Sequence, residues 1–413
     1  MKTRRVLLIL SMAALLIAGL YSGEQLFFIG FIMMAMTVLL SVISVIYTGV
    51  TFKYLQTLNP AVGVKGDTLE YTMEVHNDLF FPSPYIKLYY DSIDSLLSGN
   101  SASTTISLMP RSSAALTESI FCRYRGRWPV GIRKAEICDF FGLIRLKLDV
   151  TKFLSHKPIT LLVRPRVLYL GSLPLRRKHD EGLMEAAPRR SDDVAMLSDI
   201  RKYRVGDQMK RIHWKLTARQ REVMVKNYEE TSLPDLLLYV DTHSMALGQT
   251  DRLNLEDTLV ESATAVVHYL LERGMPTSLI FYGERREQLR GSRPEHFQSF
   301  YSVLSEMPFN GKFAAEDVLM NDLKLVTHSG NLFLITWSLT EKLFDLLMLM
   351  NSSSLNITMV YVYEPEPAGA PDVKRAVAQG KIKRMISEMR NAGIIIIDLK
   401  PGENFAERVS VLK

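Results

Sequence analysis

The sequence predicts a mixed fold, α/β plus all-β, with a transmembrane helical hairpin, a β-sandwich-like domain and a doubly wound parallel sheet. Three observations predict these parts. Val6–Leu20 and Leu26–Val50 carry no charge, residues 59–163 alternate polar and apolar positions, and residues 231–413 alternate strand with helix patterns. At 413 residues the chain exceeds what one hydrophobic core usually organises, so several domains are expected.

The two apolar runs predict a helical hairpin over residues 1–55. At about 1.5 Å per residue the second run spans roughly 37 Å, which is enough to cross a bilayer. The first run spans only about 24 Å by the same rise and also suits a signal peptide with a cleavage zone at Ala18–Ser22. We favour the hairpin, turning at Ser22–Gln25, because the second apolar run follows at once and would stop transfer.

Flanking charges predict the orientation of this hairpin. The turn carries Glu24, whereas basic residues lie on both outer flanks, at Lys2, Arg4, Arg5, Lys53 and Lys65. By the positive-inside rule both ends lie in the cytoplasm, so we expect a cell-membrane protein with two helices and a cytoplasmic bulk. Two cysteines, Cys122 and Cys138, suit a reducing cytosol but would also allow one disulfide outside the cell. A net charge of +6 and a pI near 9.1 suit contact with anionic membrane lipid, and equally nucleic acid.

Residues 59–163 have the period of half-buried strands. Leu69, Tyr71, Met73 and Val75 alternate with polar residues, and similar short runs separated by turns predict a β-sandwich-like domain. Residues 164–198 follow, rich in proline and basic runs, and are predicted to form a linker.

The tail, residues 231–413, predicts a parallel sheet. Asn254 is expected to cap the first helix, and Gly274 with Pro276 to end it. The expected strands are 236–240, 279–282, 332–335, 357–362 and 394–399, with further helices near 297–304, 342–350 and 373–389.

Residues 199–230, the signature segment, carry nine Lys/Arg and five Asp/Glu with interleaved aromatic residues. Basic and aromatic side chains together suit nucleic acid, but the acidic residues and the membrane hairpin argue against a groove that follows phosphates. A metal or catalytic centre would have only Asp199, Asp207 and His213, without a recognised ligand spacing. We favour a structural or partner-docking role, in which Ile212 and Trp214 are buried and arginines pair with carboxylates: Arg201, Arg211 and Arg219 with Asp207, Glu229 and Glu230.

The signature segment resembles domain-of-unknown-function family 58, a bacterial family. The resemblance rests on Arg201, Tyr203, Gly206, Asp207, Arg211, Ile212, His213, Trp214, Lys215, Ala218 and Arg219. Family members resemble cofactor-free accessory proteins that accompany MoxR-type AAA+ ATPases, and often a transglutaminase-like membrane protein. The resemblance therefore implies a non-enzymatic adaptor or scaffold, without a cofactor, that presents a cytosolic domain to such an ATPase. Because of the acidic residues and the membrane hairpin, we expect no binding of nucleic acid.

The tail resembles a von Willebrand factor A domain in length and strand count. Such domains hold a divalent cation through Asp-x-Ser-x-Ser after the first strand and a later Asp. Here Asp241 matches, but His243 and Met245 replace the serines, and Trp337 stands where the later carboxylate is expected.

This substitution pattern leaves at most a weak Mg²⁺ site at Asp241 and Ser244, helped by Thr242 and Thr336, because Mg²⁺ needs octahedral oxygen ligands. We expect Asp241 to cap the following loop instead. We expect no catalytic residues, since His243 and Ser244 would point to opposite faces of an extended segment. Two alternatives from other classes stay open: a metal-dependent membrane-bound enzyme using Asp241 and His213, and a nucleic-acid-binding membrane protein.

Overall fold

The computed structural model describes most of the chain in two compact units, residues Met1–Arg166 and Val167–Lys413. The described residues are 2–139, 141–142, 144–153, 159–175, 195–202, 212, 214–220, 222–230, 236–322, 326, 331–352, 355–363 and 372–411.

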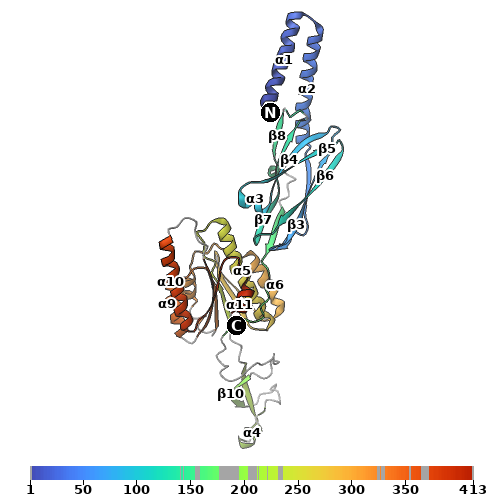
Figure 1. Cartoon of the computed structure of the whole chain (residues 1–413). Coiled ribbons are helices and arrows are strands. Elements are labelled where there is room, and N and C mark those ends of the chain that lie inside the picture. Colours follow the sequence, from blue (N-terminus) through green and yellow to red (C-terminus); the bar gives the residue numbers. More distant parts are fainter. Residues whose placement is uncertain are drawn as a thin grey trace. The chain divides into compact units, whose positions relative to one another are not determined.

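The first unit begins with two antiparallel helices, α1 (Lys2–Ser22) and α2 (Gln25–Val50), shown in Figure 1. Gly23 has φ +71° in the tight connection, a left-handed conformation that glycine adopts without strain. The helices contact one another along their length, for example at Ser11 Oγ and Met34 Sδ, 3.4 Å apart. Both are long and apolar enough to cross a membrane, and little of either is buried, as the hairpin prediction requires.

Two sheets follow in the first unit. The three-stranded sheet has the order β1-β3-β6, all antiparallel, from β1 (Lys53–Leu58), β3 (Thr68–Asn77) and β6 (Ser112–Phe121). The larger sheet has the order β2-β9-β7-β4-β5 with β8 also on β7, from β2 (Val62–Val64), β4 (Ser83–Asp91), β5 (Ala102–Leu108), β7 (Gly126–Cys138), β8 (Arg145–Asp149) and β9 (Ile159–Arg164). Short helices α3 (Ile93–Ser98) and η1 (Val150–Lys152) join strands.

The two sheets face each other through buried side chains. The alternating residues of β3, from Leu69 to Val75, are buried as their period predicted. The Tyr71 ring lies 6.3 Å from the Tyr90 ring on β4 of the other sheet. Gln56 Oε1 on β1 accepts hydrogen bonds from the Tyr71 hydroxyl at 3.0 Å and from the Ile132 amide on β7 at 3.1 Å. Each sheet therefore buries one face against the other.

The second unit contains a six-stranded sheet of order β14-β13-β12-β15-β16-β17. Five strands are parallel and β14 is an antiparallel edge. The strands are β12 (Leu236–Val240), β13 (Thr277–Tyr282), β14 (Arg286–Gly291), β15 (Asn331–Thr336), β16 (Asn356–Val362) and β17 (Ile395–Leu399).

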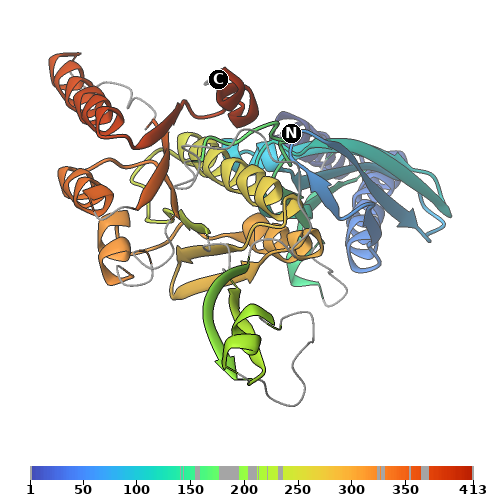
Figure 2. The same ribbon diagram turned by 90° about the horizontal axis from the view of Figure 1, so that it is seen from below.

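Helices cover both faces of this sheet (Figures 1 and 2). One face packs against α5 (Gln249–Glu272), α6 (Phe297–Glu306) with the short η3 (Pro294–His296) before it, and α11 (Phe405–Val411). The other packs against α7 (Ala315–Asn321), α9 (Glu341–Ser352) and α10 (Asp372–Asn391). In β12, Leu236, Leu238 and Val240 enter the first core, whereas Leu237 and Tyr239 enter the second. Strands buried on both faces explain the continuous apolar run of this segment.

Two predictions about element boundaries are wrong, and one strand was not predicted. Asn254 does not cap α5: the helix begins at Gln249 after Gly248, so Asn254 lies within it. The predicted linker over 164–198 ends too late, because β10 (Ala195–Lys202) begins at Ala195 and pairs with β11 (Met224–Glu230). The edge strand β14 was not predicted, because its sequence, REQLRG, has almost no apolar residues. An edge strand can carry such charge since only one side of it is paired.

Candidate functional site

The carboxyl ends of β12 and β15 form the candidate site. These strands are parallel neighbours in the sheet. The chain continues from β12 to β13 on one side of the pair and from β15 to β16 on the other side. In open α/β sheets, ligands bind at this switch point, outside the carboxyl ends of the strands. Asp241, Thr242 and His243 follow β12, whereas Thr336 ends β15 and Trp337 follows it. The Asp241 amide donates to the Ile335 carbonyl at 2.8 Å, which joins the two ends.

Asp241 is buried and its carboxylate is engaged by the protein. Oδ2 accepts from the Thr336 hydroxyl at 2.7 Å, and Oδ1 accepts from the His243 amide at 3.2 Å. The second bond closes a turn, so Asp241 does cap the loop after β12, as predicted. Burial raises the pKa of the Asp241 carboxyl above its ordinary value, and the two hydrogen bonds oppose that shift only in part.

His243 and Trp337 form a stacked pair beside Asp241. Their ring centroids are 5.3 Å apart and the planes are within 7° of parallel. Trp337 is only 8% exposed. Within the described part of the chain, neither His243 Nδ1 nor Trp337 Nε1 has a hydrogen-bond partner. At these two sequence positions, where a von Willebrand A cation site has oxygen ligands, this chain therefore has two stacked aromatic rings.

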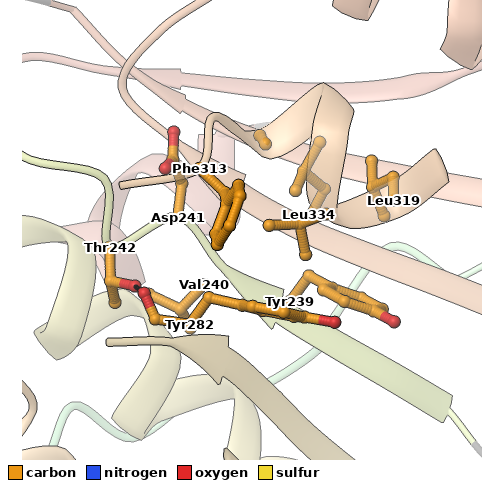
Figure 3. Close-up of a pocket in the computed structure, with 10 residues that line it drawn as sticks. Tyr239, Val240, Asp241, Thr242, Tyr282, Phe313, Leu319 and Leu334 are labelled. Atoms are coloured by element: carbon orange, nitrogen blue, oxygen red, sulfur yellow. Dashed lines mark hydrogen bonds between the residues drawn. The ribbon is translucent and has the colours of Figure 1, made fainter. Parts of the chain in front are cut away.

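The three hydroxyls proposed as substitute ligands do not converge on Asp241. The Thr242 hydroxyl donates to the Tyr282 carbonyl at 2.7 Å, and Ser244 is exposed, so only Thr336 contacts the carboxylate. Figure 3 shows Asp241 and Thr242 pointing to different sides of the segment. Across the described residues, no three His, Cys, Asp or Glu side chains are grouped as metal ligands would be.

A small cavity of ≈ 10 Å³ lies below this loop, lined by residues that include Tyr239, Asp241, Tyr282 and Phe313 (Figure 3). Its size suits about one water molecule. Next to it, Asp322 Oδ2 accepts hydrogen bonds from the Tyr239 hydroxyl at 2.7 Å, the Tyr282 hydroxyl at 3.3 Å and Arg286 Nε at 3.0 Å. Burial, together with the Asp322 carboxylate, raises the pKa of Tyr239. Sequence reasoning missed this network, because its members come from four separate elements with no shared motif.

The signature segment contains a pair of antiparallel strands and a short helix. Strands β10 and β11 are antiparallel, with a register shift between Leu197 and Asp199, and α4 (Trp214–Gln220) lies between them in sequence. Ile212 is buried, as expected, and it also pairs with Val225. Trp214 was expected to be buried and is not: it is 68% exposed.

The exposure of Trp214 follows from the geometry of α4. Leu216 and Thr217 are half-buried, and the Thr217 hydroxyl accepts from the Met224 amide on β11 at 3.0 Å. Trp214 and Ala218, one turn apart, share the opposite face, which is exposed, as is Arg219. A seven-residue helix on a two-stranded hairpin has too little neighbouring structure to cover both faces.

The other signature residues lie either outside the described residues or in elements whose backbone alone is described. Tyr203, Gly206, Asp207, Arg211 and His213 lie outside the described residues. Arg201 lies in β10, Lys215 in α4, and Glu229 and Glu230 in β11, but only their backbones are described. The predicted pairing of arginines with carboxylates in this segment therefore stays a prediction.

A buried carboxyl with a raised pKa makes stability depend on pH, with a defined sign. Below about pH 4, the ordinary pKa of Asp, Asp241 is protonated in both the folded and the unfolded chain, so folding does not bury a charge there. As pH rises towards the raised folded pKa, the unfolded chain ionises first, so the free energy of unfolding falls. We expect Asp241→Asn to remove this fall, so that its unfolding temperature relative to wild type increases with pH above about 4. Exposed Asp345→Asn is the control, and an equal pH profile in both variants would refute the assignment.

Part of the chain matches a known protein family. Residues 199–380 match the family model described as protein of unknown function DUF58. The uncharacterized protein YeaD of Bacillus subtilis is 22% identical over 225 residues, which are 54% of this chain and 53% of YeaD, so the chain spans about half of that relative.

Solved structures add no argument. The CARDB domain of a Pyrococcus furiosus protein aligns at 16% identity and TM-score 0.20, over 27% of this chain and 91% of that domain. Spo0M, a sporulation control protein of Bacillus subtilis, aligns at 12% identity and TM-score 0.16, over 27% and 49%. The likeness to known proteins therefore rests on sequence, and it is the DUF58 family model that residues 199–380 resemble.

Proposed function

We propose that this protein is a membrane-anchored, non-enzymatic adaptor that presents a cytosolic domain to a protein partner. The anchor is the helical hairpin α1–α2, whose apolar side chains are largely exposed in the unit that contains them. Exposed apolar surface of this extent marks an interaction site, and two helices of this length fit a bilayer. The basic residues on both outer flanks favour a cytoplasmic location for everything outside the hairpin.

We infer further that the second unit is a von Willebrand factor A-like domain. Counted from β12, its strands follow the order 3-2-1-4-5-6 of doubly wound sheets. The stacked rings of His243 and Trp337 and the engaged carboxylate of Asp241 favour a domain that binds proteins without a cofactor.

The observation that carries the adaptor proposal is the exposed face of α4. Trp214 belongs to the family signature, yet its side chain is 68% exposed, with Arg219 exposed on the same helix. Tryptophan and arginine are the residues most enriched at the energetic centres of protein interfaces. The partner we propose is a MoxR-type AAA+ ATPase, with a transglutaminase-like membrane protein as a further companion.

A capture experiment tests this proposal. Full-length protein carrying Trp214→Ala should recover roughly thirtyfold less AAA+ ATPase from native membranes with nucleotide bound, as for loss of a hot spot worth about 2 kcal/mol. Its unfolding temperature should hardly change, because surface substitutions usually stay within about 0.5 kcal/mol. Met320→Ala, which removes an equally exposed apolar side chain from α7, is the matched control. Wild-type capture that never recovers an AAA+ ATPase, or equal recovery with Trp214→Ala, contradicts the proposal.

A further inference from the structure

A cavity of ≈ 350 Å³ lies within the first unit, between α2 and two loops of the β-domain. The helix contributes Leu40, Ile43 and Tyr47, and the loops and strand ends contribute Phe81, Ile137 and Phe141. Its walls are mainly apolar. Its volume falls in the roughly 300–1,000 Å³ range of small-molecule sites, well above a packing defect.

The pairing of α1 with α2 shows how deep this cavity lies along the hairpin. Gly19 lies against Phe28, Gly30 against Leu15, and Ser11 against Met34, so the residue numbers of each pair add to 45 or 47. Extending this register places Arg5 opposite residues 40–42 of α2. The cavity, lined by α2 residues from Thr37 to Thr48, therefore lies at the level of the first charged residues of α1. In a membrane-spanning hairpin, that level is the boundary between hydrocarbon and headgroups.

The loops beside the cavity carry exposed aromatic rings. Phe80, Phe81 and Phe141 are 73%, 59% and 48% exposed. The Arg111 guanidinium lies 4.0 Å from the centre of the Phe80 ring, and its amide donates to the Leu79 carbonyl at 3.0 Å. Aromatic and basic side chains at one level are typical of surfaces that sit in the membrane interface.

The polar groups of the cavity wall are consistent with a hydrocarbon ligand rather than an ion. The Asp139 carboxylate is occupied: it accepts from the Ser41 hydroxyl at 2.5 Å, the Ile144 amide at 2.7 Å and the Phe141 amide at 3.3 Å. These bonds fix the β7–β8 loop to α2. The Ser83 hydroxyl is buried at 4% exposure and, within the described residues, has no hydrogen-bond partner. The wall thus offers mainly apolar surface, with Ser83 among its few polar residues.

We propose that this cavity binds one acyl chain of a membrane phospholipid, which packs against the apolar side chains of α2 and of Ile137 and Phe141. The proposal rests on the membrane anchoring proposed above. Bound lipid fills the space between α2 and the loops, and so holds the β-domain against the membrane surface.

Photocrosslinking in a bilayer tests the proposal. Full-length protein is placed in nanodiscs of phosphatidylethanolamine and phosphatidylglycerol, with a trace of phosphatidylcholine that carries a diazirine on one acyl chain. After illumination, mass spectrometry locates the labelled residues. We expect label on α1 and α2 and also at Ser83 and Ile137, which are 4% and 2% exposed and line the cavity. Label on the helices without label on these two residues overturns the lipid site but leaves the anchor intact. No label on either helix overturns the anchor itself.

Two substitutions on α2 sharpen the test. Ser44 lines the cavity, so Ser44→Phe should fill it and lower labelling of Ser83 and Ile137 about tenfold, the factor for a loss of roughly 1.4 kcal/mol. Ile46→Phe adds the same ring at an exposed position that does not line the cavity and should leave labelling unchanged. Labelling of α1 should be equal in both variants, which confirms insertion. Equal loss of loop labelling in the two variants contradicts the assignment of the cavity.

Discussion

Replacing Gly311 with alanine is expected to destabilise the second unit by about 3 kcal/mol or more, at the upper end of overpacking substitutions. The Gly311 amide donates to the Thr242 carbonyl at 2.9 Å, and its carbonyl accepts from the Ser244 amide at 3.0 Å. A Cβ at this position would overlap the Tyr282 carbonyl oxygen and lie 3.0 Å from that of Thr242. Both obstacles are backbone atoms, so the loop that follows β12 must move.

Thermal unfolding of the full-length protein measures this effect. A loss of about 3 kcal/mol corresponds to a fall of roughly 6–12 °C for a domain of this size. Gly380→Ala is the matched control, because a Cβ there meets no atom within 4 Å and the position lies within α10. Alanine is the better helix former by about 0.8–1 kcal/mol, so this control should be slightly stabilised. A Gly311→Ala protein as stable as wild type would show that 242–244 and 311 do not pair as described.

Replacing Trp337 with alanine is expected to cost about 3–5 kcal/mol, the usual loss for a buried aromatic residue. The side chain is 8% exposed, belongs to the core beneath α5 and stacks on His243. Its removal leaves a void and exposes the imidazole. Denaturant unfolding of the full-length chain measures the change, provided that the unfolding free energies of the two proteins depend on denaturant concentration with the same slope.

Trp337→Phe separates packing from hydrogen bonding at the same position. Phenylalanine keeps a ring over His243 and removes the indole N–H, which has no partner among the described residues. An unpartnered buried donor itself costs about 1–3 kcal/mol, so its removal offsets part of the lost volume. We expect Trp337→Phe to be several-fold less costly than Trp337→Ala. If both variants lose the same stability, the indole N–H has a partner and the site needs a different description.

The parallel sheet was largely predictable from sequence, because each central strand is a short apolar run between helical patterns. β12 was predicted with its observed boundaries, and the other four parallel strands to within two residues at either end. The first boundary of α5 was wrong, since Asn254 satisfies a local capping rule, whereas the helix begins six residues earlier, after Gly248. β14 was missed for the opposite reason: its pairing with β13 is a long-range contact that its polar sequence does not reveal.

At the candidate site, the sequence indicated which residues take part but not most of the contacts between them. The cap formed by Asp241 was expected, whereas the bond from Thr336 and the stack of His243 on Trp337 depend on β12 and β15 being neighbours. Trp214 was assigned to the interior because large aromatic residues usually pack there, but α4 is too short to cover it. Whether a side chain such as that of Trp214 is exposed depends on the packing around its helix, which a single sequence does not show.

The central claim is that the helical hairpin anchors the protein with everything else in the cytoplasm, and reporter fusions at the carboxyl terminus test it most directly. A fluorescent protein that folds only in the cytoplasm and an alkaline phosphatase that is active only outside it are each fused to the full-length chain. We expect fluorescence at the cell membrane and no phosphatase activity. Phosphatase activity without fluorescence would place both units outside the cell, beyond the reach of an ATP-driven partner, and would contradict the account.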